Sequence, residues 1–313
     1  MVVRFLLRYA LFALPALVGI ALHVWSYRSS FPAPRLTSNI AVNEQIDRLS
    51  AVSTDSVRVL AVGSSMTLNN LASAQVVANL GPAFQNAGAW GIGAAELPLY
   101  AAPLLAHFKP AEVLVVTNLM DLAQGSHFTP NDASNVAQHL AEGTGLHAYL
   151  LHWNAPYYLV QMRANRIRFT DGANYEHLGY DKYGGSTLEV PSERIDPDRY
   201  NAAPVRWDQA DRSRMNTFAR FADTLHAQGV RLTVLISPYR EGLRTTAVEE
   251  DATRYVDWLR TVLHHSGQRL VNGYERSWAD SLYCDASHFD HEGADAFTHW
   301  CMEQLAAQEA ITP

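Results

Sequence analysis

The chain has little cysteine and lacks the common nucleotide-binding motifs. Its 313 residues include two cysteines, Cys284 and Cys301, too few for a disulfide framework and without the Cys-x-x-Cys spacing of a metal site. No Gly-x-x-x-x-Gly-Lys occurs, which excludes a P-loop, and Gly88, Gly91 and Gly93 stand in the wrong order for a dinucleotide-binding turn. The sequence therefore predicts neither a cofactor nor a bound metal.

Acidic side chains are absent from the first 43 residues, since the first acid is Glu44. Four unbalanced arginines lie before it, at Arg4, Arg8, Arg28 and Arg35. The rest of the chain holds 20 basic and 31 acidic side chains, a net charge of −11 within a total of −7. Because an acidic body has no field that attracts a phosphate backbone, nucleic acid is excluded as a partner.

Formal charge is also missing from residues 9–25, which read YALFALPALVGIALHVW. At about 1.5 Å per residue, these 17 residues just reach the lower limit for crossing a bilayer core. We expect residues 1–28 to form an uncleaved membrane anchor with one N-terminal transmembrane helix. Two alternatives are a signal peptide cleaved near the small residues at 19–21 and a buried helix of a soluble protein.

The remaining chain is rich enough in apolar residues to bury a core, with 48% hydrophobic and 18% charged side chains. Residues 29–56 are interpreted as a linker and lead-in, and residues 57–313 as the globular domain. Near-continuous apolar runs predict buried strands at four places, 57–62, 113–117, 230–236 and 269–272.

Helical patterns separate these strands. Gly81 and Gly229 close two of the helices, and Lys109-Pro110 ends another. Helices that alternate with apolar strands predict an α/β fold whose parallel sheet is covered on both faces, with chemistry at the carboxyl ends of the strands.

An insertion at residues 122–204 interrupts the alternation. It holds seven of the 14 tyrosines, together with Trp153 and a basic cluster at Arg163, Arg166 and Arg168. Aromatic rings with hydroxyl groups suit a sugar-binding wall. The alternative is that these rings pack a lid onto the sheet.

The turn after the first predicted strand reads Gly63-Ser64-Ser65-Met66. A serine on such a turn is displayed above the sheet edge, where the N–H groups of the following helix offer donors for an oxyanion. Serine is also a common helix N-cap, which is the structural alternative.

The far end of the chain supplies a second motif, Asp285-Ala286-Ser287-His288. An aspartate three residues before a histidine on one loop can accept the Nδ1–H of the imidazole while Nε2 faces a serine elsewhere. The alternatives are a metal site that includes His291, and an aspartate that caps the last helix beside an incidental histidine.

Together with Asn86-Ala87-Gly88, these motifs resemble those of the SGNH (GDSL-like) hydrolase superfamily, in the same order and over roughly residues 57–307. The resemblance implies a three-layer, flavodoxin-like fold. It also implies that Ser65 is the nucleophile, His288 the base, Asp285 the residue that orients the base, and Gly88 an oxyanion-hole donor.

The third motif of the family departs from its usual form. It corresponds to Asn118-Leu119-Met120-Asp121, which places Met120 where the family has its oxyanion-hole asparagine and leaves Asn118 as the candidate amide donor. With Ser64 also in place of an aspartate, the chain resembles the SGNH-like proteins of bacterial envelope acylation, which act in alginate and cellulose O-acetylation and in teichoic acid D-alanylation.

This second resemblance implies a serine-dependent O-acyltransferase that moves an acetyl or similar group onto a cell-envelope polysaccharide. A membrane-bound O-acyltransferase would be its partner and acyl donor. The implied location is the bacterial inner membrane, crossed once, with the catalytic domain on the periplasmic or outer face. Two alternatives are a periplasmic GDSL-type esterase or deacetylase, and a non-catalytic polysaccharide-binding scaffold with a vestigial triad.

Overall fold

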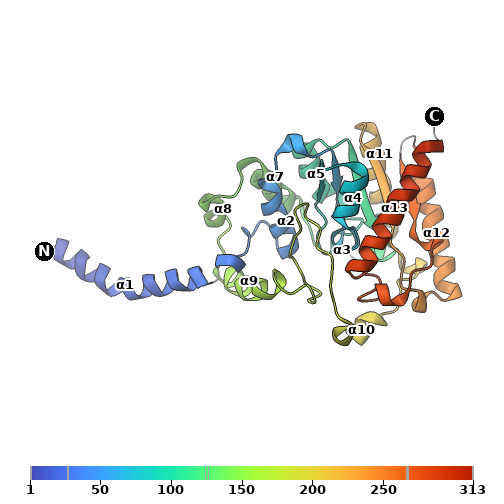
Figure 1. Cartoon of the computed structure of the whole chain (residues 1–313). Coiled ribbons are helices and arrows are strands. Elements are labelled where there is room, and N and C mark those ends of the chain that lie inside the picture. Colours follow the sequence, from blue (N-terminus) through green and yellow to red (C-terminus); the bar gives the residue numbers. More distant parts are fainter. Residues whose placement is uncertain (1, 27, 124, 126, 266–267, 312–313) are drawn as a thin grey trace.

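The structure is a computed structural model that describes residues 2–26, 28–123, 125, 127–265 and 268–311 (Figure 1). The strands are β1 (Val59–Ala61), β2 (Phe84–Asn86), β3 (Glu112–Thr117), β4 (Arg231–Ile236) and β5 (Arg269–Asn272). The helices are α1 (Val2–Ser26), α2 (Ile40–Ser50), α3 (Ser65–Asn69), α4 (Ser73–Leu80), α5 (Leu97–Phe108), α6 (Met120–Ala123), α7 (Pro130–Glu142), α8 (Leu146–Leu151), α9 (Ala155–Arg168), α10 (Pro197–Tyr200), α11 (Arg212–Ala227), α12 (Thr246–Val262) and α13 (His291–Ile311).

The five strands form one parallel sheet in the order β2-β1-β3-β4-β5. This confirms the predicted α/β fold with a parallel sheet, and the strand order is that of flavodoxin-type doubly wound sheets. The order reverses between β1 and β3, the place where such sheets bind ligands. Strand β2 was not predicted, because it is a three-residue edge strand in which two of the residues, Gln85 and Asn86, are polar.

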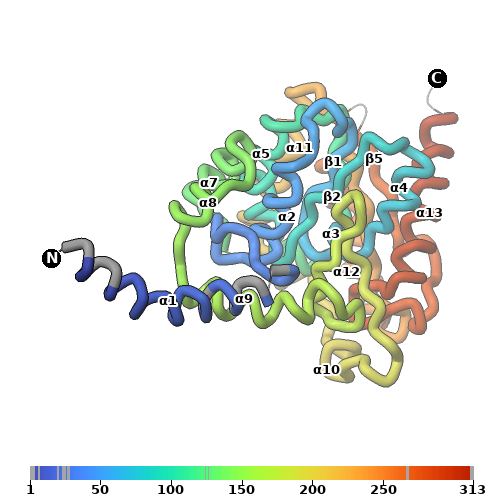
Figure 2. Tube along the Cα trace, turned by 60° about the vertical axis from the view of Figure 1, so that its left-hand side comes forward, coloured from blue at the N-terminus to red at the C-terminus, as the bar shows by residue number. Residues whose placement is uncertain are grey.

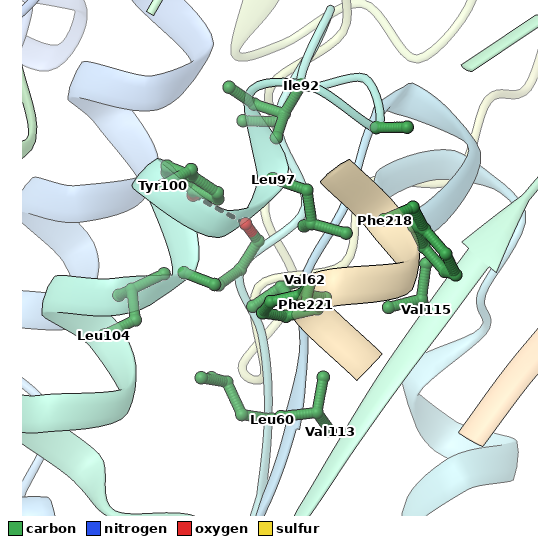
Figure 3. Close-up of a cluster of buried hydrophobic side chains, with 14 of the residues drawn as sticks. Leu60, Val62, Ile92, Leu97, Tyr100, Leu104, Val113, Val115, Phe218 and Phe221 are labelled. Atoms are coloured by element: carbon green, nitrogen blue, oxygen red, sulfur yellow. Dashed lines mark hydrogen bonds between the residues drawn. The ribbon is translucent and has the colours of Figure 1, made fainter. Parts of the chain in front are cut away.

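Helices cover both faces of the sheet, as the apolar strands require. On one face, alternate strand side chains pack against α5 and α11 (Figure 3); they include Leu60, Val62, Val113 and Val115, with Leu97, Tyr100, Leu104, Phe218 and Phe221 from the helices. On the other face, Ala61, Leu114 and Val116 belong to a core shared with α4 and α13. The domain therefore has three layers.

The lead-in at residues 29–56 is more than a linker. Its helix α2 begins at the N-cap Asn39, whose side chain accepts the Ala41 N–H. Ile46 and Leu49 of α2 are fully buried in the same core as the strands, and α2 packs against α7. The globular body therefore begins before the first strand.

Helix α1 extends away from the body at the end where α8 and α9 lie (Figures 1 and 2). The sequence predicts a transmembrane helix here, and a helix does form over Val2–Ser26. The membrane-spanning part of the prediction is not supported: within the described residues, no helix combines the length and the apolar character needed to cross a bilayer.

The tyrosines of the insertion use most of their hydroxyl groups inside the protein. Five of them have partners in other segments: Tyr157 with Asn43, Tyr158 with the Arg35 N–H, and Tyr175, Tyr180 and Tyr200 with the carbonyls of Cys284, Ala41 and Asp280. These contacts favour the interpretation that the insertion packs onto the body over that of an open aromatic wall.

Glu44 on α2 connects the lead-in to α9. Its Oε1 accepts the Ala33 N–H at 3.0 Å and the Asn165 side-chain amide at 2.9 Å. Burial raises the pKa of Glu44 to about 7, against the opposing effect of these two hydrogen bonds. Because this pKa lies above that of an unfolded glutamate, the folded state holds the proton more tightly, and ionisation of Glu44 destabilises the fold as the pH rises through 7.

Glu44→Gln is expected to stabilise the protein at alkaline pH, because glutamine keeps the accepting oxygen and cannot ionise. The gain in the free energy of unfolding should grow from near zero around pH 4 to about 1–3 kcal/mol around pH 8.5. Urea unfolding across this pH range measures it. Glu193→Gln, at an exposed position, is the matched control and should show no such trend. A gain that does not change with pH would contradict the assignment.

Candidate active site

Ser65 lies at the first position of α3, just beyond β1. Ser64 is the N-cap, and its hydroxyl accepts the Met66 N–H at 3.2 Å. The Thr67 hydroxyl donates to the Val116 carbonyl at 3.0 Å and accepts the Val116 N–H at 3.0 Å, which joins α3 to β3. These bonds hold Ser65 between the ends of β1 and β3, at the switch point of the sheet.

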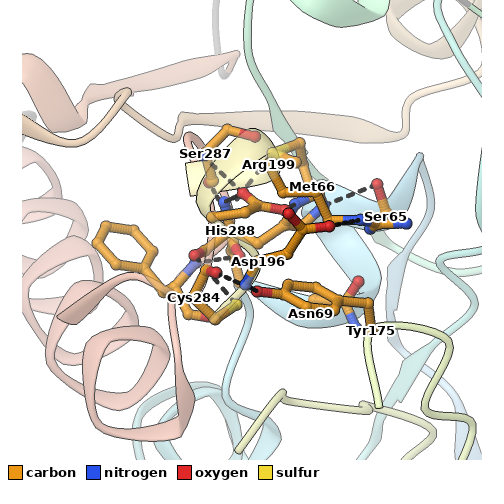
Figure 4. Close-up of polar contacts among 12 residues, drawn as sticks. Ser65, Met66, Asn69, Tyr175, Asp196, Arg199, Cys284, Ser287 and His288 are labelled. Carbon is orange, nitrogen blue, oxygen red and sulfur yellow. Dashed lines mark hydrogen bonds and ion pairs between the residues drawn. The ribbon is translucent and has the colours of Figure 1, made fainter. Parts of the chain in front are cut away.

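The structure brings Ser65, His288 and Asp285 together, although Ser65 and His288 are 223 positions apart. His288 Nε2 lies 2.9 Å from Ser65 Oγ, and His288 Nδ1 lies 2.7 Å from Asp285 Oδ2. Figure 4 shows Ser65 and His288 facing each other, with Ser287 beside them. This is the contact order of a serine nucleophile, its base and the carboxylate that orients the base.

Asp285 is held by its own loop. Its Oδ1 accepts the N–H groups of Ser287 at 2.8 Å and of His288 at 2.7 Å. Burial of Asp285 favours the neutral acid, but His288 and these N–H groups outweigh it, so the pKa of Asp285 is lowered. At neutral pH the carboxylate is ionised, and it fixes the proton of His288 on Nδ1.

Asn70 holds the histidine loop against the sheet, a role that the sequence does not indicate. Its side-chain amide donates to Ser237 Oγ at 2.8 Å and to the Ser287 carbonyl at 3.0 Å, and its Oδ1 accepts the Phe289 N–H at 3.0 Å. The sequence signal for this role is the Asn69-Asn70 pair shortly after the serine turn, two polar residues whose partners the sequence does not reveal. Because the Asn70 amide is fully buried, these three hydrogen bonds fix the position of the loop.

The two predicted oxyanion donors already have partners. The Gly88 N–H donates to Asn86 Oδ1 at 2.8 Å, while the Asn118 amide contacts Met66 Sδ at 3.4 Å and Asn118 Oδ1 accepts the Met120 N–H. Their role in an oxyanion hole stays a prediction. The Ser65 N–H is a third candidate, because the first N–H groups of a helix have no intrahelical acceptor.

Gly88 has a packing role that the structure does explain. A Cβ added at Gly88 would lie 2.6 Å from the Leu68 backbone nitrogen. Only glycine therefore permits the chain after β2 to pass this close to α3. This close approach supports the helix that carries Ser65.

Asp121 brings a second carboxyl group near the histidine. It follows β3, and the Thr117 hydroxyl donates to its Oδ2 at 2.8 Å. Burial raises the pKa of Asp121 to about 6, although hydrogen bonds from the hydroxyls of Ser64 and Thr117 and the charge of His288 oppose the shift. Asp121 thus connects the end of β3 to the turn that carries Ser65.

The metal-site alternative does not match the observed contacts. Both ring nitrogens of His288 already face Asp285 and Ser65. The ring of His291 lies against the hydroxyl of Thr187, at 2.9 Å. Both cysteines are free and buried, and the Sγ of Cys284 lies against the carbonyls of His288 and Phe289.

The end of the insertion lies against the histidine loop, a contact that the sequence did not indicate. The Tyr175 hydroxyl donates to the Cys284 carbonyl at 2.7 Å, and the Arg199 carbonyl accepts the Ala286 N–H at 3.1 Å. The Arg199 guanidinium lies 4.6 Å from the centre of the Tyr175 ring (Figure 4). This part of the insertion therefore forms one wall of the candidate site.

A buried arginine fastens that wall to the sheet. Arg240 Nε donates to the Tyr200 carbonyl at 2.7 Å, and its Nη1 pairs with Asp280 at 2.6 Å. The Arg240 backbone N–H donates to the Ala286 carbonyl at 3.1 Å. Arg240, four residues after β4, thus connects three parts of the chain: the insertion, the residues before the histidine loop, and the loop itself.

Comparison with known proteins adds no relative to this description. No protein-family model matches the chain, and no curated protein sequence matches it. A function must therefore be inferred from the side chains of the site and from the motifs that place them there.

Proposed function

We propose that the protein is a serine-dependent O-acyltransferase of the SGNH type that transfers an acetyl or similar acyl group to a cell-envelope polysaccharide. The observation that carries the proposal is the contact chain from Ser65 through His288 to Asp285, with distances of 2.9 and 2.7 Å. Membrane attachment through residues 1–28, and a membrane-bound O-acyltransferase as acyl donor, belong to the same proposal and rest on the motif resemblance.

The first half of the reaction would load the acyl group onto Ser65. His288 Nε2 takes the hydroxyl proton while Ser65 Oγ attacks the carbonyl carbon of the donor. The carbonyl oxygen becomes an oxyanion, and the Ser65 N–H at the start of α3 would donate to it. The intermediate collapses, the leaving oxygen takes the proton from His288, and an ester on Ser65 remains.

The second half would pass the acyl group to the acceptor. A sugar hydroxyl gives its proton to His288 Nε2 and attacks the ester carbon. The bond to Ser65 Oγ then breaks, and the serine recovers the proton. Throughout, Asp285 stabilises the imidazolium that forms in each half. The accessibility of the pair suits this role, because Ser65 and His288 are partly exposed while Asp285 is buried.

The altered third motif supports transfer over simple hydrolysis. Loss of one oxyanion donor lowers the rate by about 10²–10³-fold, and the side chain that fills the family's asparagine position is Met120. An acyl-enzyme that is hydrolysed slowly and persists until an acceptor binds fits this arrangement better than rapid hydrolysis does.

The full-length chain, purified in detergent, provides the test. A serine-reactive phosphonate should label Ser65, located by mass spectrometry, and Ser65→Ala should remove the label. An aryl acetate should turn over slowly alone and faster with oligosaccharide, with the acetyl group recovered on the sugar. Rapid release of free acetate without glycan would identify an esterase instead, and glycan binding without labelling would identify a scaffold.

A further inference from the structure

Exposed apolar side chains gather at one end of the body. Among the described residues outside α1, eight large apolar side chains are exposed, and seven of them lie between positions 146 and 167. Each of the seven is 51–75% exposed. They are Leu146, Leu150, Leu151, Trp153, Leu159, Val160 and Ile167, which we call the α8–α9 surface. Helices α8 and α9, which carry six of the seven, lie at the same end of the body (Figure 1), and exposed apolar side chains gathered in this way mark an interaction site.

Helix α9 has apolar and basic side chains on the face that points away from the body. Tyr158, Met162 and Asn165 form its buried face. The outer face of α9 carries Leu159, Val160 and Ile167 at helical spacing. The exposed Arg163 and Arg166 lie between them. A helix on the surface of a soluble protein has a polar outer face, whereas an outer face of apolar and basic residues is typical of helices at a membrane surface.

The charge of this region is opposite to that of the rest of the chain. Residues 143–170 contain three arginines and no aspartate or glutamate, in a protein with a net charge of −7. Arg168 pairs with Glu176 at 2.5 Å. Arg163 and Arg166 are exposed beside the apolar side chains. The surface thus offers apolar contacts and positive charge together.

The α8–α9 surface is also joined to α1. The chain that leaves α1 places Phe31 in a stack on Tyr158, with ring centres 5.7 Å apart, and Trp153 stacks on the same Tyr158 at 5.2 Å. Tyr158 in turn accepts the Arg35 N–H at 3.2 Å. In both views of the fold, α1 departs from the end of the body that carries α8 and α9 (Figures 1 and 2).

We propose that the α8–α9 surface binds an anionic phospholipid bilayer, beside α1. The acyl region would receive the leucines and Trp153, and the lipid phosphates would pair with Arg163 and Arg166. If residues 1–28 attach the protein to the membrane, as proposed above, this surface would in addition give the body a fixed orientation. This inference does not depend on the reaction at Ser65.

The orientation would extend to the candidate site through the insertion. The Leu178 N–H donates to the Arg168 carbonyl at the end of α9. A few residues earlier, Tyr175 contacts the Cys284 carbonyl on the histidine loop. The chain after α9 therefore connects the α8–α9 surface directly to the wall of the site.

A polarity-sensitive dye on the full-length chain tests the proposal. Both native cysteines are buried, so a dye will react selectively with Leu159→Cys, or with Ala307→Cys on the exposed side of α13. With phosphatidylglycerol-containing vesicles, the dye at 159 should shift to the blue and be quenched by brominated lipid, while the dye at 307 stays in water. If α1 binds the vesicles but the dye at 159 stays in water, the proposal is wrong and a protein partner becomes the occupant.

The arginines allow a second measurement. Arg163→Gln/Arg166→Gln is expected to weaken cosedimentation with anionic vesicles roughly 10–30-fold, at about a kilocalorie per mole for each arginine at the surface, and pure phosphatidylcholine should abolish the difference. The matched control is Arg220→Gln/Arg254→Gln, which removes the same charge from exposed positions on α11 and α12. Equal weakening by both pairs would show an effect of net charge and overturn the proposal.

Discussion

Replacement of Ser65 by alanine is expected to lower polymer acylation in cells by at least about 10³-fold and to prevent phosphonate labelling in vitro. The reason is chemical, since alanine has no oxygen to form the acyl ester. The fold should be unaffected, because Ser64 and not Ser65 caps α3, and the Ser65 hydroxyl forms its hydrogen bond with His288. Acylation of the polymer in cells that carry each variant measures the effect.

The control is a second serine replaced in the same way. Ser134→Ala removes an exposed hydroxyl from α7, where it bonds only to the Pro130 carbonyl, and acylation should stay at the wild-type level. Both variants should unfold within about 0.5 kcal/mol of wild type. Full acylation by a stable Ser65→Ala protein would rule out an acyl-serine intermediate.

The fold was predictable because its central strands β1, β3 and β4 lie in near-continuous apolar runs. Strands β3, β4 and β5 lie within one residue of the predicted 113–117, 230–236 and 269–272. For β3 and β4 the reason is that a strand covered on both faces needs a nearly uninterrupted apolar run. Edge strand β2 has one neighbouring strand and carries Gln85 and Asn86, so its composition does not distinguish it from a loop.

The candidate site likewise has residues that the sequence predicted and supporting residues that it did not. Ser65, Asp285 and His288 were predicted from two local motifs, a serine turn after a strand and an aspartate three residues before a histidine, and from the resemblance of these motifs to those of the SGNH superfamily. The supports were not predicted, because they are long-range contacts. Asn70 bonds to residues 167 and 217 positions away, and no local pattern encodes such partners.

The predicted amide donors, Gly88 and Asn118, are a different case. In the structure, Gly88 and Asn118 lie just after β2 and β3, the strands on either side of β1. Where an N–H or an amide points, however, depends on its neighbours. Here Asn86 and Met66 supply the contacts, and the sequence pattern contains no information about that competition.

The second large effect is expected for Asp285→Asn, a change of one atom. Asparagine can keep its oxygen on the N–H groups of Ser287 and His288, which Asp285 Oδ1 accepts at 2.8 and 2.7 Å. Its NH₂ group then replaces the oxygen that faces His288 Nδ1 at 2.7 Å. Since NH₂ is a donor, Nδ1 must become the acceptor, and the ring proton moves to Nε2.

A histidine with its proton on Nε2 cannot accept the proton of Ser65. We therefore expect acyl transfer and phosphonate labelling to fall about 10³–10⁴-fold, although Ser65 and His288 are both present and the loop keeps its backbone bonds. The tautomer gives an independent signature: the nitrogen NMR shifts of the His288 ring should show Nδ1–H in wild type and Nε2–H in the variant.

Asp290→Asn is the matched control on the same loop. Asp290 Oδ1 accepts the Gly293 N–H at 2.7 Å at the start of α13, and asparagine can cap the helix equally well, so activity should stay within about threefold of wild type. If Asp285→Asn and Asp290→Asn proved equally active, Asp285 would not set the tautomer, and His288 would be oriented by the loop alone. The expected result is that only Asp285→Asn is slow and that its His288 ring carries the proton on Nε2. The Asp285 carboxylate then acts on Ser65 only through the histidine, which makes Asp285 a positioning residue.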